Sequence, residues 1–209
     1  MNSFQMNARS YNDKASLGPM TKVYPLVAKQ IIERTGVTQG ICIDLGGGPG
    51  MLRIALAEQS DLRVTVCDLL QECIDVAKEN IAGRLLTKRM SARPGRAEEL
   101  PFANNSIDLV ASRGSIFFWE DHKKGLSEVM RVLKPKGWAY IGGGFGSAEL
   151  LREVEEFNAD NKEWKERRKE RVQKFSPEYY QAILNDLGIK GSVDSGETGT
   201  WIVFQKQIY

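Results

Sequence analysis

A glycine-rich loop between a strand pattern and a helix pattern is the feature of this sequence that most constrains its fold. Residues 44–50 read DLGGGPG; they begin within a short β-branched run at 41–45 and precede a helical pattern at 51–59. Glycine lets the backbone turn tightly and lets a ligand approach closely. The helix after the loop presents unpaired N–H groups at its N-terminus. The segment therefore predicts a strand–turn–helix unit with a ligand at the turn, and a tight turn without a ligand is the alternative interpretation.

Strand and helix patterns alternate along most of the chain. Hydrophobic spacing predicts strands at residues 41–45, 62–69, 86–90, 107–112 and 138–143, and helices at residues 21–35, 51–59, 71–82 and 121–133. This alternation favours a parallel sheet. The closing elements are a long charged helix at 147–174, a shorter helix at 176–187 and strands near 189–194 and 199–207. Two strands joined so briefly must be antiparallel.

We therefore predict an α/β fold of the Rossmann-like, doubly wound type. Its seven-stranded sheet is mostly parallel, with an antiparallel C-terminal strand and a helical insertion before the last two strands. The 209 residues are enough for one domain with a full hydrophobic core. The expected parts of this single domain are an N-terminal lid and helix at 1–35, a cofactor-binding core at 36–146, a helical substrate roof at 147–187 and C-terminal strands at 188–209.

The composition excludes several classes of protein. Hydrophobic residues make up 42% and charged residues 27% of the chain, which excludes a wholly disordered protein. A net charge of +2, from 29 basic and 27 acidic residues, gives no strong nucleic-acid signal, although it leaves RNA open as a substrate. Three cysteines without a CxxC pair and a single histidine do not supply a metal site. An odd cysteine number, a polar N-terminus and the lack of an apolar run of about 20 residues favour a cytoplasmic protein with no membrane partner.

The acid at the end of the second predicted strand indicates which ligand the loop binds. Asp68 lies 18 residues after Gly50, where a carboxylate can accept both hydroxyls of a ribose. A dinucleotide fingerprint would need a third glycine at position 51, which is Met51, so NAD is disfavoured. Asp44 would repel a pyrophosphate and attract an ammonium group. The methionyl tail of S-adenosylmethionine carries such an ammonium.

Further segments extend this pattern over roughly residues 41–145. They are IDLGGGPG in the loop region, Asp68, AEELPFANNSIDLVASRGSIFFWED at 97–121 and EVMRVLKPKGWAYIGGG at 128–144. In this order and spacing they resemble the class I S-adenosylmethionine-dependent methyltransferases, especially their small ubiquinone-biosynthesis-like branch. The resemblance implies S-adenosylmethionine as the cofactor, S-adenosylhomocysteine as the product, and methyl transfer by in-line displacement.

The expected acceptor is a small molecule, because the balanced charge supplies no broad basic surface for a nucleic acid. The alternative function is a non-catalytic S-adenosylmethionine-binding regulator or partner protein, which would lack a substrate cavity under residues 147–187. An NAD-dependent dehydrogenase is a more distant alternative, which Asp44 and Met51 disfavour. The sequence carries no signal for an oligomeric state.

The resemblance also assigns cofactor-binding roles to individual residues. The residues expected around the methionyl part are Asp44, Gly46, Gly48, Gly50, Ser112 and Arg113. The residue expected at the ribose is Asp68, and those expected at the adenine are Leu69, Ala97 and Glu98. Tyr11 would close over the cofactor as part of a lid, and a disordered N-terminal tail is the alternative interpretation for this residue.

One position departs from the family pattern. The family usually has an aspartate before the segment that begins at Ala97, where it accepts a hydrogen bond from the adenine amino group. This chain has Arg96, which has no acceptor. Either the backbone or Glu98 takes over that role, or Arg96 turns to the solvent.

The residues identify no catalytic group unambiguously, and three side chains are candidates. His122 could act as a general base, but a histidine in a first helical turn is more often exposed, and we expect that here. Arg113 could bind an acidic substrate or form a surface ion pair, and Tyr11 is the third candidate. The glycines at 142–146 either make room for a turn and a ligand or form a second anion-binding loop. Aromatic and apolar side chains of the roof could cover the substrate, namely Trp164, Val172, Phe175, Tyr179 and Tyr180.

Overall fold

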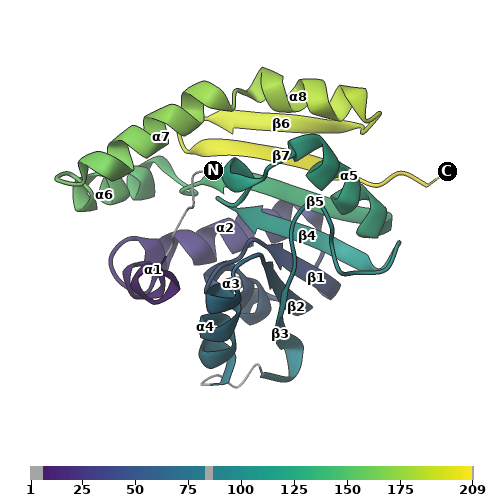
Figure 1. Cartoon of the computed structure of the whole chain (residues 1–209), viewed down its shortest axis with the longest axis horizontal. Helices are drawn as coiled ribbons and strands as arrows, with labels where there is room; N and C mark the ends of the chain where they lie inside the picture. Colours follow the sequence, from purple (N-terminus) through teal and green to yellow (C-terminus); the bar gives the residue numbers. More distant parts are fainter. Residues whose placement is uncertain (1–6, 83–86, 209) are drawn as a thin grey trace.

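The computed structural model describes residues 7–82 and 87–208, and its centre is a seven-stranded sheet (Figure 1). Its strands are β1 Gln39–Leu45, β2 Asp61–Asp68, β3 Met90–Pro94, β4 Ile107–Arg113, β5 Leu133–Gly144, β6 Gly191–Gly196 and β7 Gly199–Gln205. They lie in the order β3-β2-β1-β4-β5-β7-β6. Neighbouring strands pair in parallel except at β7, which is antiparallel to both β5 and β6. The predicted mostly parallel sheet with an antiparallel C-terminal strand is confirmed.

Helices cover both faces of this sheet. They are α1 Ala8–Ala15, α2 Met20–Thr35, α3 Met51–Gln59, α4 Gln71–Ala82, α5 His122–Val132, α6 Ala148–Phe157, α7 Lys162–Lys174 and α8 Pro177–Asp186. Apolar side chains of α2 and α3 pack on one face, and those of α5 and α8 pack on the other. The helices α1, α6 and α7 gather at the end of the sheet where β5 finishes (Figure 1).

The central strand β1 shows why these strands appear as continuous apolar runs. Cys42 belongs to the core on one face, Ile43 and Leu45 belong to the core on the other, and all three are almost completely buried. A strand covered by helices on both sides needs apolar residues at successive positions. Asp44 is the one charged residue within this run, and it is buried like its apolar neighbours, with only 1% of its surface exposed.

Several boundaries differ from those that the sequence predicts. The expected helix at 147–174 is divided into α6 and α7, because the Asn161 side chain accepts a hydrogen bond from the Trp164 N–H and starts a new helix. The third strand begins at Met90 rather than Leu86, which lies outside the described residues. The fifth strand begins five residues earlier than expected, at Leu133 instead of Trp138.

The N-terminal helix α1 was not predicted. Asn7 caps it by accepting a hydrogen bond from the Ser10 N–H. Arg9 pairs with Glu79 of α4 at 2.8 Å, and Asn80 of α4 donates to Asn12. Contacts with residues 68 and 70 positions away therefore order a segment whose own composition is polar.

The sheet order identifies the ligand-binding edge. β1 lies between β2 and β4, so the chain switches direction across the sheet at this strand. In doubly wound sheets a ligand binds beyond the carboxyl ends of the strands at such a switch point. The glycine loop follows the carboxyl end of β1, and Asp68 is the last residue of β2. Within the described ranges, no helix is long and apolar enough to cross a membrane.

Candidate active site

The glycine loop requires the backbone freedom that glycine gives. Gly46, Gly48 and Gly50 have φ angles of +62°, +54° and +84°, which side-chain-bearing residues rarely adopt. The N–H of Gly46 donates to the carbonyl of Cys67 at 2.7 Å, which ties the loop to the end of β2. A Cβ added to Gly46 would lie 2.2 Å from the Cβ of Ser115, so the turn after β4 supports the loop from beneath.

Asp44 lies directly under this loop and offers an unused acceptor. Its Oδ2 accepts a hydrogen bond from the Arg53 N–H at 3.0 Å, whereas its buried Oδ1 has no hydrogen-bond partner among the described residues. A Cβ on Gly47 would lie 2.5 Å from the carboxyl group, so the loop closes tightly over it. Burial raises the pKa of Asp44 to about 7, although the Arg53 charge and N–H act in the opposite direction. A buried oxygen without a donor is suited to an ammonium group of a ligand.

Asp68 is held rigidly at the neighbouring strand end. Its Oδ2 accepts from the Gly48 N–H and its Oδ1 from the Leu70 N–H, both at 2.9 Å. Burial raises the pKa of this carboxyl group, and hydrogen bonds from backbone N–H groups and from the Cys73 thiol oppose that rise. A carboxylate is an acceptor-only group, which suits it to the hydroxyls of a ribose. Leu69 is 65% exposed beside this carboxylate and offers an apolar surface to a base.

The carboxylate of Glu98 accepts hydrogen bonds from other residues of the protein, and Arg96 is one of its donors. Its Oε1 accepts from the backbone N–H groups of Glu120 and Asp121, at 2.8 and 3.2 Å. Arg96 donates to Glu98 at 3.3 Å and to Glu120 at 2.6 Å, so Arg96 does not simply turn to the solvent. Burial acts to raise the pKa of Glu98, but these donors hold it below its usual value. The Glu98 carboxylate therefore orders the turn before α5, next to the buried Ala97.

Ser112 is completely buried behind the glycine loop. Its hydroxyl lies 2.6 Å from that of Ser115, which donates to the carbonyl of Leu45 at 3.0 Å. The indole of Trp119 donates to the same Ser115 hydroxyl at 3.2 Å. Ser112 thus acts on the loop through Ser115, a residue that the sequence reasoning did not identify. The signal that points to Ser115 is spatial, namely its contact with Gly46.

Arg113, Tyr11 and Tyr24 form one layer of side chains at the same edge of the sheet. Arg113 donates from Nε to the carbonyl of Gly144 at 2.8 Å, and its guanidinium lies 5.1 Å from the centre of the Tyr24 ring. The hydroxyls of Tyr11 and Tyr24 are 3.0 Å apart, which joins α1 to α2. The described residues place no carboxylate against Arg113, so the expected alternative of a surface ion pair does not hold.

His122 is buried, with 7% of its surface exposed, and the expectation of an exposed side chain is wrong. Its Nε2 lies 2.8 Å from the carbonyl of Ile116, and its Nδ1 lies 2.9 Å from the hydroxyl of Tyr179. Because a carbonyl only accepts, Nε2 carries the hydrogen and Nδ1 accepts from Tyr179. Burial lowers the pKa of this imidazole. Both ring nitrogens of His122 are thus engaged in hydrogen bonds within the protein, and the ring connects α5 to α8.

Close packing explains the glycines at the end of β5. A Cβ on Gly142 would lie 2.1 Å from the carbonyl of Thr200, and one on Gly143 would lie 2.7 Å from the ring of Phe117. A Cβ on Gly144 would meet the Thr198 carbonyl at 2.7 Å. The segment needs glycine because β7 and an aromatic ring lie against it.

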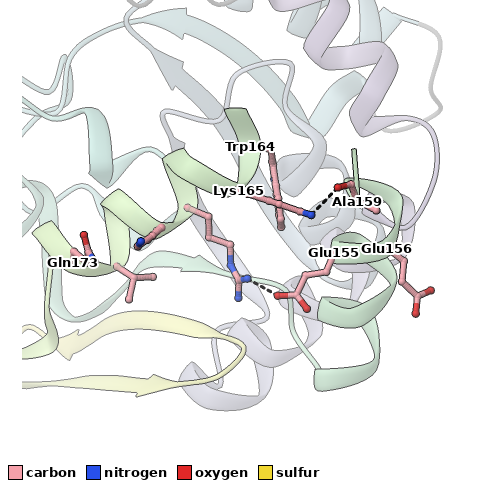
Figure 2. A pocket seen from close by; sticks show the side chains of 9 residues that line it. Glu155, Glu156, Ala159, Trp164, Lys165 and Gln173 are labelled. Atoms are coloured by element: carbon pink, nitrogen blue, oxygen red, sulfur yellow. Dashed lines mark hydrogen bonds and ion pairs between the residues drawn. The ribbon is translucent and has the colours of Figure 1, made fainter. Parts of the chain in front are cut away.

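The predicted roof residues lie in different places. A pocket of about 780 Å³ lies between α6 and α7, and the Arg168–Glu155 ion pair spans it at 2.5 Å (Figure 2). Trp164 lines this pocket and packs near Phe145, whereas Val172 lines it with 69% of its surface exposed. Phe175 packs instead against His122, with 5.0 Å between the ring centres. The rings of Tyr179 and Tyr180 also pack against His122, at 5.5 and 5.6 Å. These side chains do not form one continuous cover.

Comparisons with known proteins agree with this geometry. Residues 43–141 match the family model described as a methyltransferase domain. A solved structure from Methanococcus maripaludis, assigned as an S-adenosyl-L-methionine-dependent methyltransferase, superposes with a TM-score of 0.92. It is 35% identical, and the match covers 100% of this chain and 98% of that one.

Curated relatives match over a shorter part of their length. The Escherichia coli protein YafE, itself uncharacterized, is 42% identical over 47% of each chain. Demethylmenaquinone methyltransferase of Lactobacillus johnsonii is 34% identical over 52% of this chain and 46% of its own. The 2-methyl-6-phytyl-1,4-hydroquinone methyltransferase 2 of Oryza sativa is 33% identical over 48% of this chain and 28% of its own. The chain thus spans about half or less of the length of these relatives.

Proposed function

The chain belongs to the class I S-adenosylmethionine-dependent methyltransferases, and from this premise we propose that it transfers a methyl group from S-adenosylmethionine to a small molecule. The observation that carries the proposal is the buried Asp44 carboxyl group, whose Oδ1 has no partner among the described residues while a loop of glycines closes over it. An ammonium group would give that oxygen its donor and favour the ionised carboxylate.

The residues around the loop fit the other parts of S-adenosylmethionine. Asp68 would accept hydrogen bonds from the ribose hydroxyls, and the exposed Leu69 would pack on the adenine. Because Glu98 is occupied by Arg96 and by backbone N–H groups, we assign recognition of the adenine amino group to a backbone carbonyl. When bound, the cofactor supplies an electrophilic methyl group on a sulfonium, which the acceptor displaces in line.

The contribution of the protein is position and exclusion of water. Tyr11 from α1, Tyr24 from α2 and Arg113 from β4 lie together at the carboxyl edge, where they would close the site from the side of the N-terminal helix. Holding two reactants in line can supply several kcal/mol of the barrier reduction. His122 has no free nitrogen, so we propose an acceptor whose nucleophile does not depend on that residue as a base.

A small-molecule acceptor has two supports. Several relatives carry names that specify quinone or hydroquinone substrates, which are neither nucleic acids nor proteins. The net charge of +2 supplies no broad basic surface for a polynucleotide.

Titration calorimetry with S-adenosylmethionine, S-adenosylhomocysteine and NAD tests the cofactor. We expect both sulfur compounds to bind and NAD not to bind, and tighter binding of NAD would overturn the proposal. Formation of S-adenosylhomocysteine in the presence of a metabolite extract tests the transfer itself. A protein that binds the cofactor but never turns it over, with any acceptor fraction, would be a non-catalytic binding protein.

A further inference from the structure

Arg171 on α7 is a half-buried guanidinium with no anionic partner among the described residues. Its Cζ lies 5.3 Å from the ring centre of Phe117 and 4.7 Å from that of Phe118. Within the described ranges, no carboxylate pairs with it and no oxygen accepts a hydrogen bond from it. The neighbouring arginines of the same helix differ, because Arg167 pairs with Glu163 and Arg168 pairs with Glu155, both at 2.5 Å.

The guanidinium of Arg171 keeps its hydrogen-bond donors available, because the described residues contact only its faces. Two aromatic faces stabilise its charge, but they leave the N–H donors at the edge of the guanidinium unused. Burial, with the nearby Arg167, lowers the pKa of Arg171, and Tyr11 acts in the opposite direction. Because Arg171 is only half-buried and the described residues do not use its N–H groups, these donors remain accessible to a ligand. The planar fork of the guanidinium matches a carboxylate or a phosphate.

The place of Arg171 connects it to the methyl-transfer site. Phe117 and Phe118 belong to the short helical turn Ile116–Phe118, which follows β4 and begins one residue after Ser115. Ser115 supports Gly46 of the glycine loop from beneath. The ring of Phe117 lies over Gly143 at the end of β5, which is the same edge of the sheet.

We propose that Arg171 binds an anionic oxygen group of the methyl acceptor, a carboxylate or a phosphate, while Phe117 and Phe118 contact an adjoining apolar or aromatic part. This inference rests on the proposed function and narrows it to acidic acceptors. The cation–π contacts hold the guanidinium in a fixed orientation, so little side-chain freedom is lost when the anion binds.

Pairs of small probes that differ in charge test this inference without knowledge of the acceptor. Phenylacetate is compared with phenylacetamide, and phenyl phosphate with phenol, by ligand-observed NMR titration of the protein saturated with S-adenosylhomocysteine. We expect at least one anion to bind about tenfold or more tightly than its neutral counterpart. The pair that shows the preference distinguishes a carboxylate from a phosphate.

Three variants locate the effect. Arg171→Gln should abolish the preference for the anion, and Arg171→Lys, which keeps the charge but not the fork, should retain part of it. Arg152→Gln removes an exposed arginine of α6 that lies 3.8 Å from Glu149, and it should leave the preference unchanged. Unchanged affinity for S-adenosylhomocysteine in Arg171→Gln would show that the variant is folded.

The inference is overturned if the wild-type protein prefers neither anion, or if the preference survives in Arg171→Gln. Failure of the proposed function has a different signature, namely no binding of S-adenosylhomocysteine to the wild-type protein. In that case the same probe pairs are titrated into the protein alone. Arg171 and its aromatic partners belong to the chain itself, so the charge preference still decides the inference.

Discussion

Replacement of Asp44 by asparagine should stabilise the ligand-free protein and weaken its cofactor binding at the same time. The pKa of this carboxyl group rises from 3.8 to about 7 on folding, even with the favourable charge of Arg53 nearby. At about 1.4 kcal/mol per pH unit, that rise corresponds to roughly 4 kcal/mol against the ionised form at high pH. The introduced asparagine would mimic the neutral form and could still accept from the Arg53 N–H, so we expect a net gain of about 2 kcal/mol at pH 8.

The sign of the pH dependence follows from the direction of the pKa change. Between pH 3.8 and about 7 the folded protein holds a proton on Asp44 that the unfolded chain has released. The contribution of Asp44 to stability is therefore full at low pH and is lost as the pH rises toward 7. The advantage of Asp44→Asn should thus be larger at pH 8 than at pH 5.5.

Thermal unfolding of the ligand-free protein measures this effect. A gain of about 2 kcal/mol should raise the melting temperature by roughly 4–8 °C at pH 8. The affinity for S-adenosylhomocysteine should fall by about 10–150-fold, because the ammonium loses a charged acceptor. In the wild-type protein that affinity should also weaken below pH 7, whereas in the variant it should not. Asp61→Asn, at the exposed start of β2, is the matched control and should change neither property.

A less stable Asp44→Asn protein at pH 8, or one that binds S-adenosylhomocysteine as tightly as the wild type, would refute this reasoning.

Four other substitutions test separate parts of the account. Asp68→Ala should weaken S-adenosylhomocysteine binding about tenfold or more in calorimetry, because two ribose hydroxyls lose a charged acceptor; unchanged affinity would mean that the ribose lies elsewhere. Glu98→Ala should lower the free energy of unfolding by about 1–3 kcal/mol in urea, because two backbone N–H groups lose their acceptor. Arg96→Gln should lower it less, because the ion pairs of this partly exposed arginine are screened by water. An equal cost for both would contradict the role given to Glu98. His122→Ala should cost about 1–3 kcal/mol by leaving the Ile116 carbonyl unpaired. Since burial holds the pKa of His122 below 6.5, the wild-type protein should lose stability as the pH falls through that value, and the variant should show less of that loss.

Local pattern was sufficient to predict most of the fold. Strands such as β1 appear as continuous apolar runs because helices cover both of their faces, and the brief connection before β7 implies its antiparallel pairing. The helix α1 and the break between α6 and α7 were not predicted. The first depends on contacts with α4 residues 68 and 70 positions away, and the second on a single capping side chain, Asn161.

In the site too, the sequence predicts the features that depend on local pattern and misses those that depend on residues distant in the chain. The loop glycines and Asp68 were placed correctly at neighbouring strand ends because the order of strands and turns determines where strands finish. The burial of His122 was missed because its partner Tyr179 lies 57 residues further along the chain. The pairing of Arg96 with Glu120, and the support that Ser115 gives to Gly46, depend equally on residues brought together only by folding.

Methyl transfer to a small molecule is tested most directly with S-adenosylmethionine labelled on its methyl group. The protein is incubated with this compound and, separately, with metabolite, total RNA and total protein fractions, and the label in each is measured. We expect label in the metabolite fraction, and we expect Asp68→Ala to reduce it. Label confined to RNA or protein would contradict a small-molecule acceptor, and no label in any fraction would contradict methyl transfer.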